Sequence, residues 1–193
     1  MPKTTTAPAI RGDLRPNRTA SGRRTAAPGR QAARYIAYGQ RATAASQLRG
    51  QWVDPAGKPC SQAEVMAWVR EGAMSQPYTA HAVFSLPQGA LEATDYCAAL
   101  NQAGAVQGYR LMVHTDTAYN HAHALFFWEK RLDKETFLAW QATIREELSQ
   151  REQQQVTGQA ASLALAEATR QASGYSGSSE MAQPQTEAVG YGY

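Results

Sequence analysis

The sequence has little cysteine and no long apolar run. Its two cysteines, Cys60 and Cys97, stand apart without C-x-x-C spacing, so neither a disulfide framework nor a thiolate zinc site is indicated and reduced thiols are expected. No stretch approaches the roughly 18 apolar residues of a membrane span, and the arginine-rich start lacks the apolar centre of a signal peptide. We therefore expect a cytoplasmic protein without a membrane span.

Acidic residues are almost missing from the first quarter of the chain. Residues 1–49 contain ten Lys or Arg against one acid, Asp13, which gives a balance of +9. Because the 193-residue chain carries +3 in total, residues 50–193 carry −6. Arginines that neutralise phosphates release condensed counterions, so this asymmetry predicts a polyanionic partner. A solubilising tail or an organelle-targeting sequence is the alternative interpretation.

Large apolar side chains are sparse at both ends of the chain. Residues 1–29 are rich in Pro, Thr, Arg and Gly, and they predict a basic arm that is disordered when free, because they cannot bury enough surface to offset ordering. Residues 156–193 turn to Gln, Ala, Gly and Ser, which predicts a flexible low-complexity tail with a marginal helix over 160–172. One folded domain, residues 30–155, is expected between these two tails.

The middle of the chain alternates helical and strand-like patterns. Helices are expected over 31–48 with Gly39 as an interruption or end, after the Ser61/Glu64 capping box to about 72, over 91–103, and over 134–155. Strands are expected over 78–86, 110–114 and 121–127, with a strand end and turn in 51–58. The order strand, helix, strand, strand, helix predicts a ferredoxin-like α+β sandwich with an antiparallel sheet.

Three of the four histidines lie within ten residues of one another. Alternate side chains of a strand share a face, so His121 and His123 project together. The polar segment 116–120 is suited to turn the chain back antiparallel, which would bring His114 beside them. Three neutral imidazoles from adjacent strands suit a divalent metal such as Zn, Mn, Ni or Co and leave open coordination positions. Solvated or core histidines in an ordinary hairpin are the alternative.

The pattern His114-x-Asp116-x-x-x-x-His121-x-His123 resembles the histidine motif of conjugative relaxases, the HUH-type endonucleases that nick one DNA strand at a plasmid transfer origin. The resemblance covers roughly residues 31–150. It implies an antiparallel sheet with helices on one face and the metal on the other, and a divalent cation such as Mg, Mn or Zn. It further implies DNA as the partner, together with relaxosome accessory proteins and type IV coupling proteins.

The resemblance also implies a nucleophilic tyrosine upstream of the histidines. Arg34-Tyr35-Ile36 resembles the short relaxase motif that carries it, and Tyr38 lies one helical turn further on as the alternative nucleophile. Either tyrosine is equally well interpreted as a packing anchor of the helix. Arg30, Arg34 and Arg41 are the arginines expected to hold DNA.

Two further side chains have roles that the sequence leaves open. Asp116 is expected either to accept the spare N–H of a metal-bound imidazole or to accept the proton of the attacking tyrosine. His81 faces the site or forms an ordinary core or surface hydrogen bond, and the second interpretation is favoured. In relaxase chemistry the tyrosine forms a 5′ phosphotyrosine and releases a 3′ hydroxyl. An accessory DNA-binding protein and a metal-dependent hydrolase that uses water are the competing functions.

Overall fold

The computed structural model describes residues 8–41, 43, 45–86, 91–104, 106, 108–116, 120–131 and 133–174. Its elements in chain order are β1 (Ala9–Pro16), α1 (Ala27–Tyr38), β2 (Trp52–Val53), β3 (Pro59–Cys60), α2 (Gln62–Ser75), β4 (Tyr78–Ser85), α3 (Ala93–Ala103), β5 (Tyr109–His114), β6 (His121–Trp128) and α4 (Lys134–Gly174). The α+β class with an antiparallel sheet is confirmed. The finer assignment to a ferredoxin-like or relaxase fold stays a prediction.

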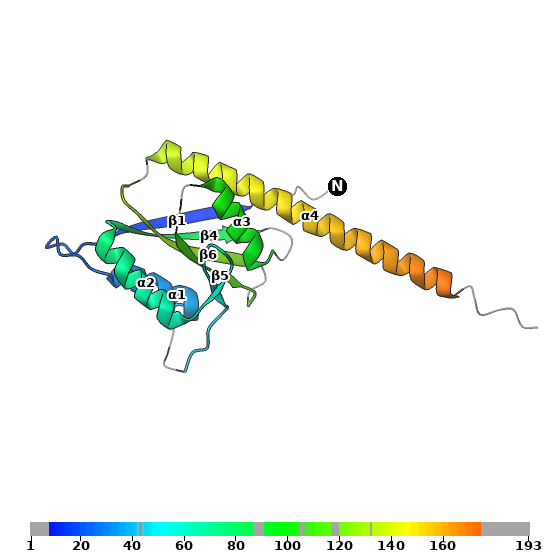
Figure 1. The fold of residues 1–193 in the computed structure, drawn as a ribbon, viewed down its shortest axis with the longest axis horizontal. Coiled ribbons are helices and arrows are strands. Elements are labelled where there is room, and N and C mark those ends of the chain that lie inside the picture. The colour runs from blue at the N-terminus through cyan, green and yellow to red at the C-terminus, as the bar shows by residue number, and fades with distance from the viewer. Residues whose placement is uncertain are drawn as a thin grey trace, which may run out of the picture. The chain divides into compact units, whose positions relative to one another are not determined.

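The strands form one sheet in the order β1-β4-β6-β5-β2-β3, with every neighbouring pair antiparallel (Figure 1). β4 and β6 lie at its centre and pair over their full length, from Tyr78 opposite Trp128 to Ser85 opposite His121. β5 and β6 form the predicted hairpin, whose register sets His114 directly opposite His121. The middle of the turn predicted over 116–120, residues 117–119, lies outside the described residues.

The two faces of the sheet bury different side chains because side chains alternate along each strand. On the apolar face, the side chains of β4 and β6 pack against α3 and the first part of α4, in a cluster that includes Phe84, Phe126 and Trp140. The opposite face, called the histidine face below, packs Met112 and Leu125 against α1 and α2. The expectation of helices on one face fits α3 and α4, whereas α1 and α2 cover part of the other face.

Residues 9–16 correct the prediction of a disordered arm. They form β1, an edge strand that pairs with β4 over eight residue pairs, from Ala9 opposite Ser85 to Pro16 opposite Tyr78. Ile10 is buried against the core of the apolar face, and the alternate charged residues face away from it. Backbone pairing with β4 and this burial together offset the entropy of ordering. Residues 1–7 lie outside the described part of the chain.

The helix ends follow local sequence signals. The capping box of α2 is confirmed, because the Ser61 side chain accepts from the Glu64 backbone N–H and the Glu64 carboxylate accepts from the Ser61 N–H. α1 ends before Gly39, which has a φ of +83° that favours glycine. In the described part of the chain, no helix is both long enough and apolar enough to span a membrane.

The chain divides into two compact units, Met1–Val156 and Thr157–Tyr193, one residue from the predicted boundary at 155. α4 runs on to Gly174, beyond the predicted end at 155 and across the segment interpreted as a marginal helix. Ala and Gln are frequent in this stretch, and both favour a helix. The predicted tail beyond residue 174 lies outside the described residues.

Candidate metal centre

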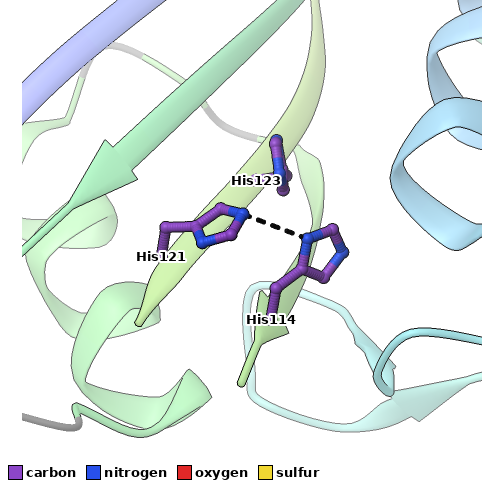
Figure 2. A group of neighbouring side chains, drawn as sticks. All are labelled: His114, His121 and His123. Carbon is purple, nitrogen blue, oxygen red and sulfur yellow. Dashed lines mark hydrogen bonds between the residues drawn. The ribbon is translucent and has the colours of Figure 1, made fainter. Parts of the chain in front are cut away.

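The three histidines of the motif converge on the histidine face. Figure 2 shows their rings turned toward one another, His114 from β5 and the other two from β6. The ring centroids of His114 and His123 are 4.5 Å apart, and both lie 5.0 Å from the centroid of His121. Each ring offers one nitrogen to a group of donor atoms that lie within 4.8 Å of one another. The sequence predicted this cluster correctly.

His114 is fixed by the end of α1. Its Nε2 lies 2.9 Å from the carbonyl oxygen of Ile36, a carbonyl in the last turn of α1 that has no partner within the helix. A carbonyl can only accept, so Nε2 of His114 carries the proton and donates it. The neighbouring carbonyls of Tyr35 and Ala37 accept from the N–H groups of Gly39 and Arg49. His114 is therefore held in the tautomer whose Nδ1 is an acceptor, and this Nδ1 forms a 3.3 Å hydrogen bond with Nε2 of His121.

Burial keeps the two innermost rings uncharged. Burial, with the nearby Arg49 guanidinium contributing, lowers the pKa of His114 to about 4. Burial lowers the pKa of His123 to about 2, with the neighbouring imidazoles contributing. Both rings are neutral at neutral pH, and a neutral imidazole is the form that binds a metal.

Two of the three donor nitrogens stand at the spacing that a small divalent cation requires, and all three lie within 4.8 Å of one another. Nδ1 of His114 and Nε2 of His121 are 3.3 Å apart. Tetrahedral ligands with Zn–N bonds of 2.0–2.1 Å lie about 3.3 Å from one another, so these two nitrogens already stand at ligand spacing. Three imidazoles also leave a coordination position open for a phosphate oxygen or water. The residues present therefore fit a divalent metal, and the donor set does not select one metal.

Of the two candidate nucleophiles, Tyr35 stands at the histidine group. Its ring centroid lies 6.1 Å from those of His81 and His123, in edge-on contact with both. Its side chain is 42% exposed, which is unusual for a tyrosine that packs against other rings. Tyr38 instead packs against the cluster formed by α1, α2 and the sheet. Tyr35 therefore lies beside the imidazoles, whereas Tyr38 packs α1 against the rest of the domain.

Two grooves include Tyr35 in their lining. One, of about 460 Å³, is lined by Arg30, Arg34 and Tyr35 of α1. The other, of about 330 Å³, is lined by Tyr35 and His81 together with Arg15 of β1. Of the three arginines predicted to bind DNA, Arg30 and Arg34 are exposed in the first groove, whereas Arg41 is exposed after α1 and does not line it.

Asp116 has a different partner from the one expected. Its two carboxylate oxygens accept hydrogen bonds of 2.7 and 2.9 Å from Nε and NH2 of Arg49, and this pairing lowers the pKa of Asp116. Other groups pair with the imidazoles in the place expected for Asp116. Nε2 of His114 donates to the Ile36 carbonyl, and Nδ1 of His123 pairs with Nε2 of His81. A carboxylate that is held by a guanidinium is also a poor proton acceptor. Among the described residues Asp116 pairs with Arg49 and holds its guanidinium, and the two roles predicted for Asp116 stay predictions.

Arg49 escaped the sequence analysis, and His81 was placed at the site only in the interpretation that was not favoured. Arg49 was one of ten basic residues in the N-terminal region, and nothing in the sequence pairs it with Asp116, 67 positions away. His81 was interpreted as an ordinary hydrogen-bonded histidine, yet its Nε2 lies 2.8 Å from Nδ1 of His123. Strand alternation predicts the face of His81, but only the register of β4 on β6 reveals its partner.

Comparisons with protein-family models, with curated proteins and with solved structures found no match for this chain. We therefore infer a function from the geometry of the site alone.

Proposed function

We propose that this protein is a metal-dependent DNA relaxase that nicks one strand at a transfer origin and carries the cut end on Tyr35. The observation that carries the proposal is the position of Tyr35, an exposed phenol set edge-on against His123 beside three converging imidazoles. A nucleophile next to a site for a Lewis acid is the arrangement that phosphoryl transfer requires.

The surroundings of Tyr35 suit a nucleic-acid strand. One of the two grooves beside it carries the exposed guanidinium groups of Arg30 and Arg34. The other carries Arg15, whose Nε is paired at 2.6 Å with Asp13 of the same groove. Guanidinium groups bind phosphates through paired donors, and they position a strand without reading its sequence. A single strand that passes Tyr35 would meet the guanidinium groups of Arg30 and Arg34 in the first groove.

The chemical step is a transesterification. The phenolic oxygen of Tyr35 attacks the scissile phosphorus, the bond from phosphorus to the 3′ oxygen breaks, and the phenolic proton ends on the released 3′ hydroxyl. The 5′ phosphate remains as an ester of Tyr35, and attack by a 3′ hydroxyl reverses the reaction. A divalent cation on the three imidazoles would supply Lewis-acid polarisation of the phosphate oxygens. The hydrogen bonds to Ile36 and His81 orient the rings that would hold this cation.

The test is formation of a covalent protein–DNA adduct. Supercoiled plasmids that carry segments of the protein's own replicon are incubated with full-length protein and Mn²⁺ or Zn²⁺. Nicked plasmid and protein-linked DNA are then resolved on denaturing gels, and peptide mass spectrometry locates the phosphotyrosine. We expect wild-type protein to nick, and we expect Tyr35→Phe to lose both products by at least about a thousandfold, because removal of a nucleophile abolishes the covalent route.

Tyr38→Phe is the matched control, because it removes the same hydroxyl one helical turn away and should nick as wild type does. Nicking without any protein-linked DNA would instead indicate a hydrolase that uses water. DNA binding without nicking, unchanged in His121→Ala, would indicate the accessory DNA-binding function. Either result overturns the proposal.

A further inference from the structure

His81 and His123 meet because of how β4 and β6 are registered. His81 lies directly opposite Leu125, and His123 lies directly opposite Val83, so the two histidines are diagonal neighbours on one face of the sheet. Diagonal positions are within reach of ring side chains. The two rings stack with centroids 5.0 Å apart and planes at 27°, and Nε2 of His81 lies 2.8 Å from Nδ1 of His123.

The hydrogen bond between these rings can run in two directions with opposite consequences. A neutral imidazole has one donor and one acceptor nitrogen. If Nδ1 of His123 donates, Nε2 of His123 keeps a free lone pair. If Nε2 of His81 donates, His123 must carry its proton on Nε2, which then cannot bind a metal. Nδ1 of His123 is already occupied by His81, so Nε2 is the nitrogen left for a cation.

We propose that His81 is a positioning residue of the three-histidine site, which accepts the Nδ1 proton of His123 and so holds that ring in the tautomer that offers Nε2 to the metal. The inference rests on the metal site of the proposed function and assigns a role to a residue outside the three-histidine motif. His81 accepts a ring proton from His123, just as the Ile36 carbonyl accepts a ring proton from His114. Such outer partners fix the orientation of ligand imidazoles.

His81 also supports the tyrosine. The ring of Tyr35 rests edge-on against both His81 and His123, at 6.1 Å from each centroid. His81 lines the groove beside Tyr35 and is partly buried there. One imidazole therefore contacts the proposed nucleophile and a proposed ligand at once, which ties the position of the phenol to the tautomer of His123.

Zinc binding to the full-length protein tests the role. Titration calorimetry with Zn²⁺ compares wild type with His81→Gln, His81→Asn and His121→Ala. The amide of Gln places an acceptor oxygen near the position of Nε2, whereas the shorter amide of Asn ends near the position of Nδ1 and cannot reach His123. We expect His81→Asn to bind zinc about 10–100-fold more weakly than wild type and His81→Gln to recover most of this loss.

A spectroscopic readout reports the tautomer itself. In protein labelled with ¹⁵N-histidine and loaded with Zn²⁺, long-range proton–nitrogen spectra should show His123 protonated on Nδ1 and metal-bound through Nε2. A residue that only fills space beneath Tyr35 would not alter this pattern when it is replaced. Thermal melts of the metal-free variants are recorded first, and if His81→Asn does not fold, the spectrum of the wild type decides alone.

The outcomes separate the two proposals. If wild-type protein binds no zinc, the metal site and the proposed function fail together. If wild type binds zinc and His121→Ala does not, but His81→Asn binds as tightly as wild type, the role of His81 is overturned and the site stands. Coordination of His123 through Nδ1 would overturn the role of His81 as well.

Discussion

The two faces of the sheet differ in what they bury. The apolar face packs aromatic and aliphatic side chains from the sheet, α3 and α4 into one cluster, with Phe84, Phe126 and Trp140 in ring contact. The histidine face packs a smaller apolar cluster beneath α1 and α2, and beside it buries His114 and His123. One side of β6 therefore packs into the larger apolar cluster, and the other side carries two histidines of a group that could hold a metal ion.

This difference shows which buried side chains lower the stability of the fold. Burying an apolar ring is favourable, whereas burying a polar ring is costly unless each nitrogen finds a partner. His114 and His123 are buried on this face beside His121, and the donor nitrogens of the three rings form a group within 4.8 Å that could hold a cation. Substitutions of the packed side chains should therefore change stability, and substitutions of the histidines should change binding.

The largest expected effect is on the apolar face. Phe126 is almost fully buried between Trp128 and Trp140, so Phe126→Ala should lower the free energy of unfolding by about 3–5 kcal/mol. Urea unfolding followed by tryptophan fluorescence measures the change. Leu163→Ala is the control, since Leu163 is 69% exposed and its truncation should stay within about 0.5 kcal/mol of wild type. Equal losses in the two variants would remove the contrast between buried and exposed sites.

The next largest effect should be the gain in stability on zinc binding, which should depend on the histidine face alone. At a free Zn²⁺ concentration 100 times the dissociation constant, wild type should gain about 2.7 kcal/mol of stability, and EDTA should remove the gain. His121→Ala should show no gain, because it removes one of the three donor nitrogens. Phe126→Leu, on the apolar face, should keep the full increment. Chemical unfolding with and without zinc provides the measurement, and loss of the increment in Phe126→Leu would contradict the separation of roles.

Gly72 tests how closely α2 packs on the histidine face. A Cβ at Gly72 of α2 would overlap the ring of Phe127, and that ring packs against Trp68 with the two ring centroids 4.8 Å apart. Gly72→Ala should therefore destabilise the fold by about 1–3 kcal/mol despite the better helix propensity of alanine. Gly158→Ala in α4 is the matched control, because nothing lies within 4 Å of its Cβ, and it should stabilise by about 0.5–1 kcal/mol. Thermal melts of the two variants show whether each substitution lowers or raises stability.

The smallest effect is expected at the start of α2. Ser61→Ala removes the side-chain acceptor of the capping box and should cost about 1 kcal/mol. Ser61→Asp supplies another acceptor to the same N–H and should recover most of that loss. α2 packs on the histidine face but supplies none of the three histidines, so zinc affinity should remain unchanged in both variants, as calorimetry can establish. A cap variant that weakened zinc binding would show that the helix and the ligands are not independent.

The sequence predicted those parts of the molecule that depend on local patterns. The alternation in β6, the turn-sized gap after His114 and the Ser61/Glu64 box each act over a few residues, so the hairpin, the histidine cluster and the cap could be anticipated. The existence of the sheet and its antiparallel pairing followed from the order of the elements.

What the sequence did not predict depends on register or on neighbours that are distant in the chain. β1 was missed because only Ile10 and Leu14 turn inward while charged residues alternate with them, a pattern typical of a protected edge strand that resembles a disordered basic arm in composition. The contact of His81 with His123 needs the eight-residue register of β4 on β6. The pairing of Arg49 with Asp116 needs the packing of the loop after α1, where the Arg49 N–H meets the Ala37 carbonyl.

The hydrogen bond from His114 to Ile36 joins the sheet to the turn of α1 that carries Tyr35. Ile36 follows Tyr35 directly, so the backbone next to the phenol accepts from an imidazole of β5. A displacement of the end of α1 would change the length of this bond, because His114 belongs to the sheet and Ile36 to the helix. The imidazole of His114 would then serve as an internal gauge of helix position, with its nitrogen resonances shifting whenever the helix end moves.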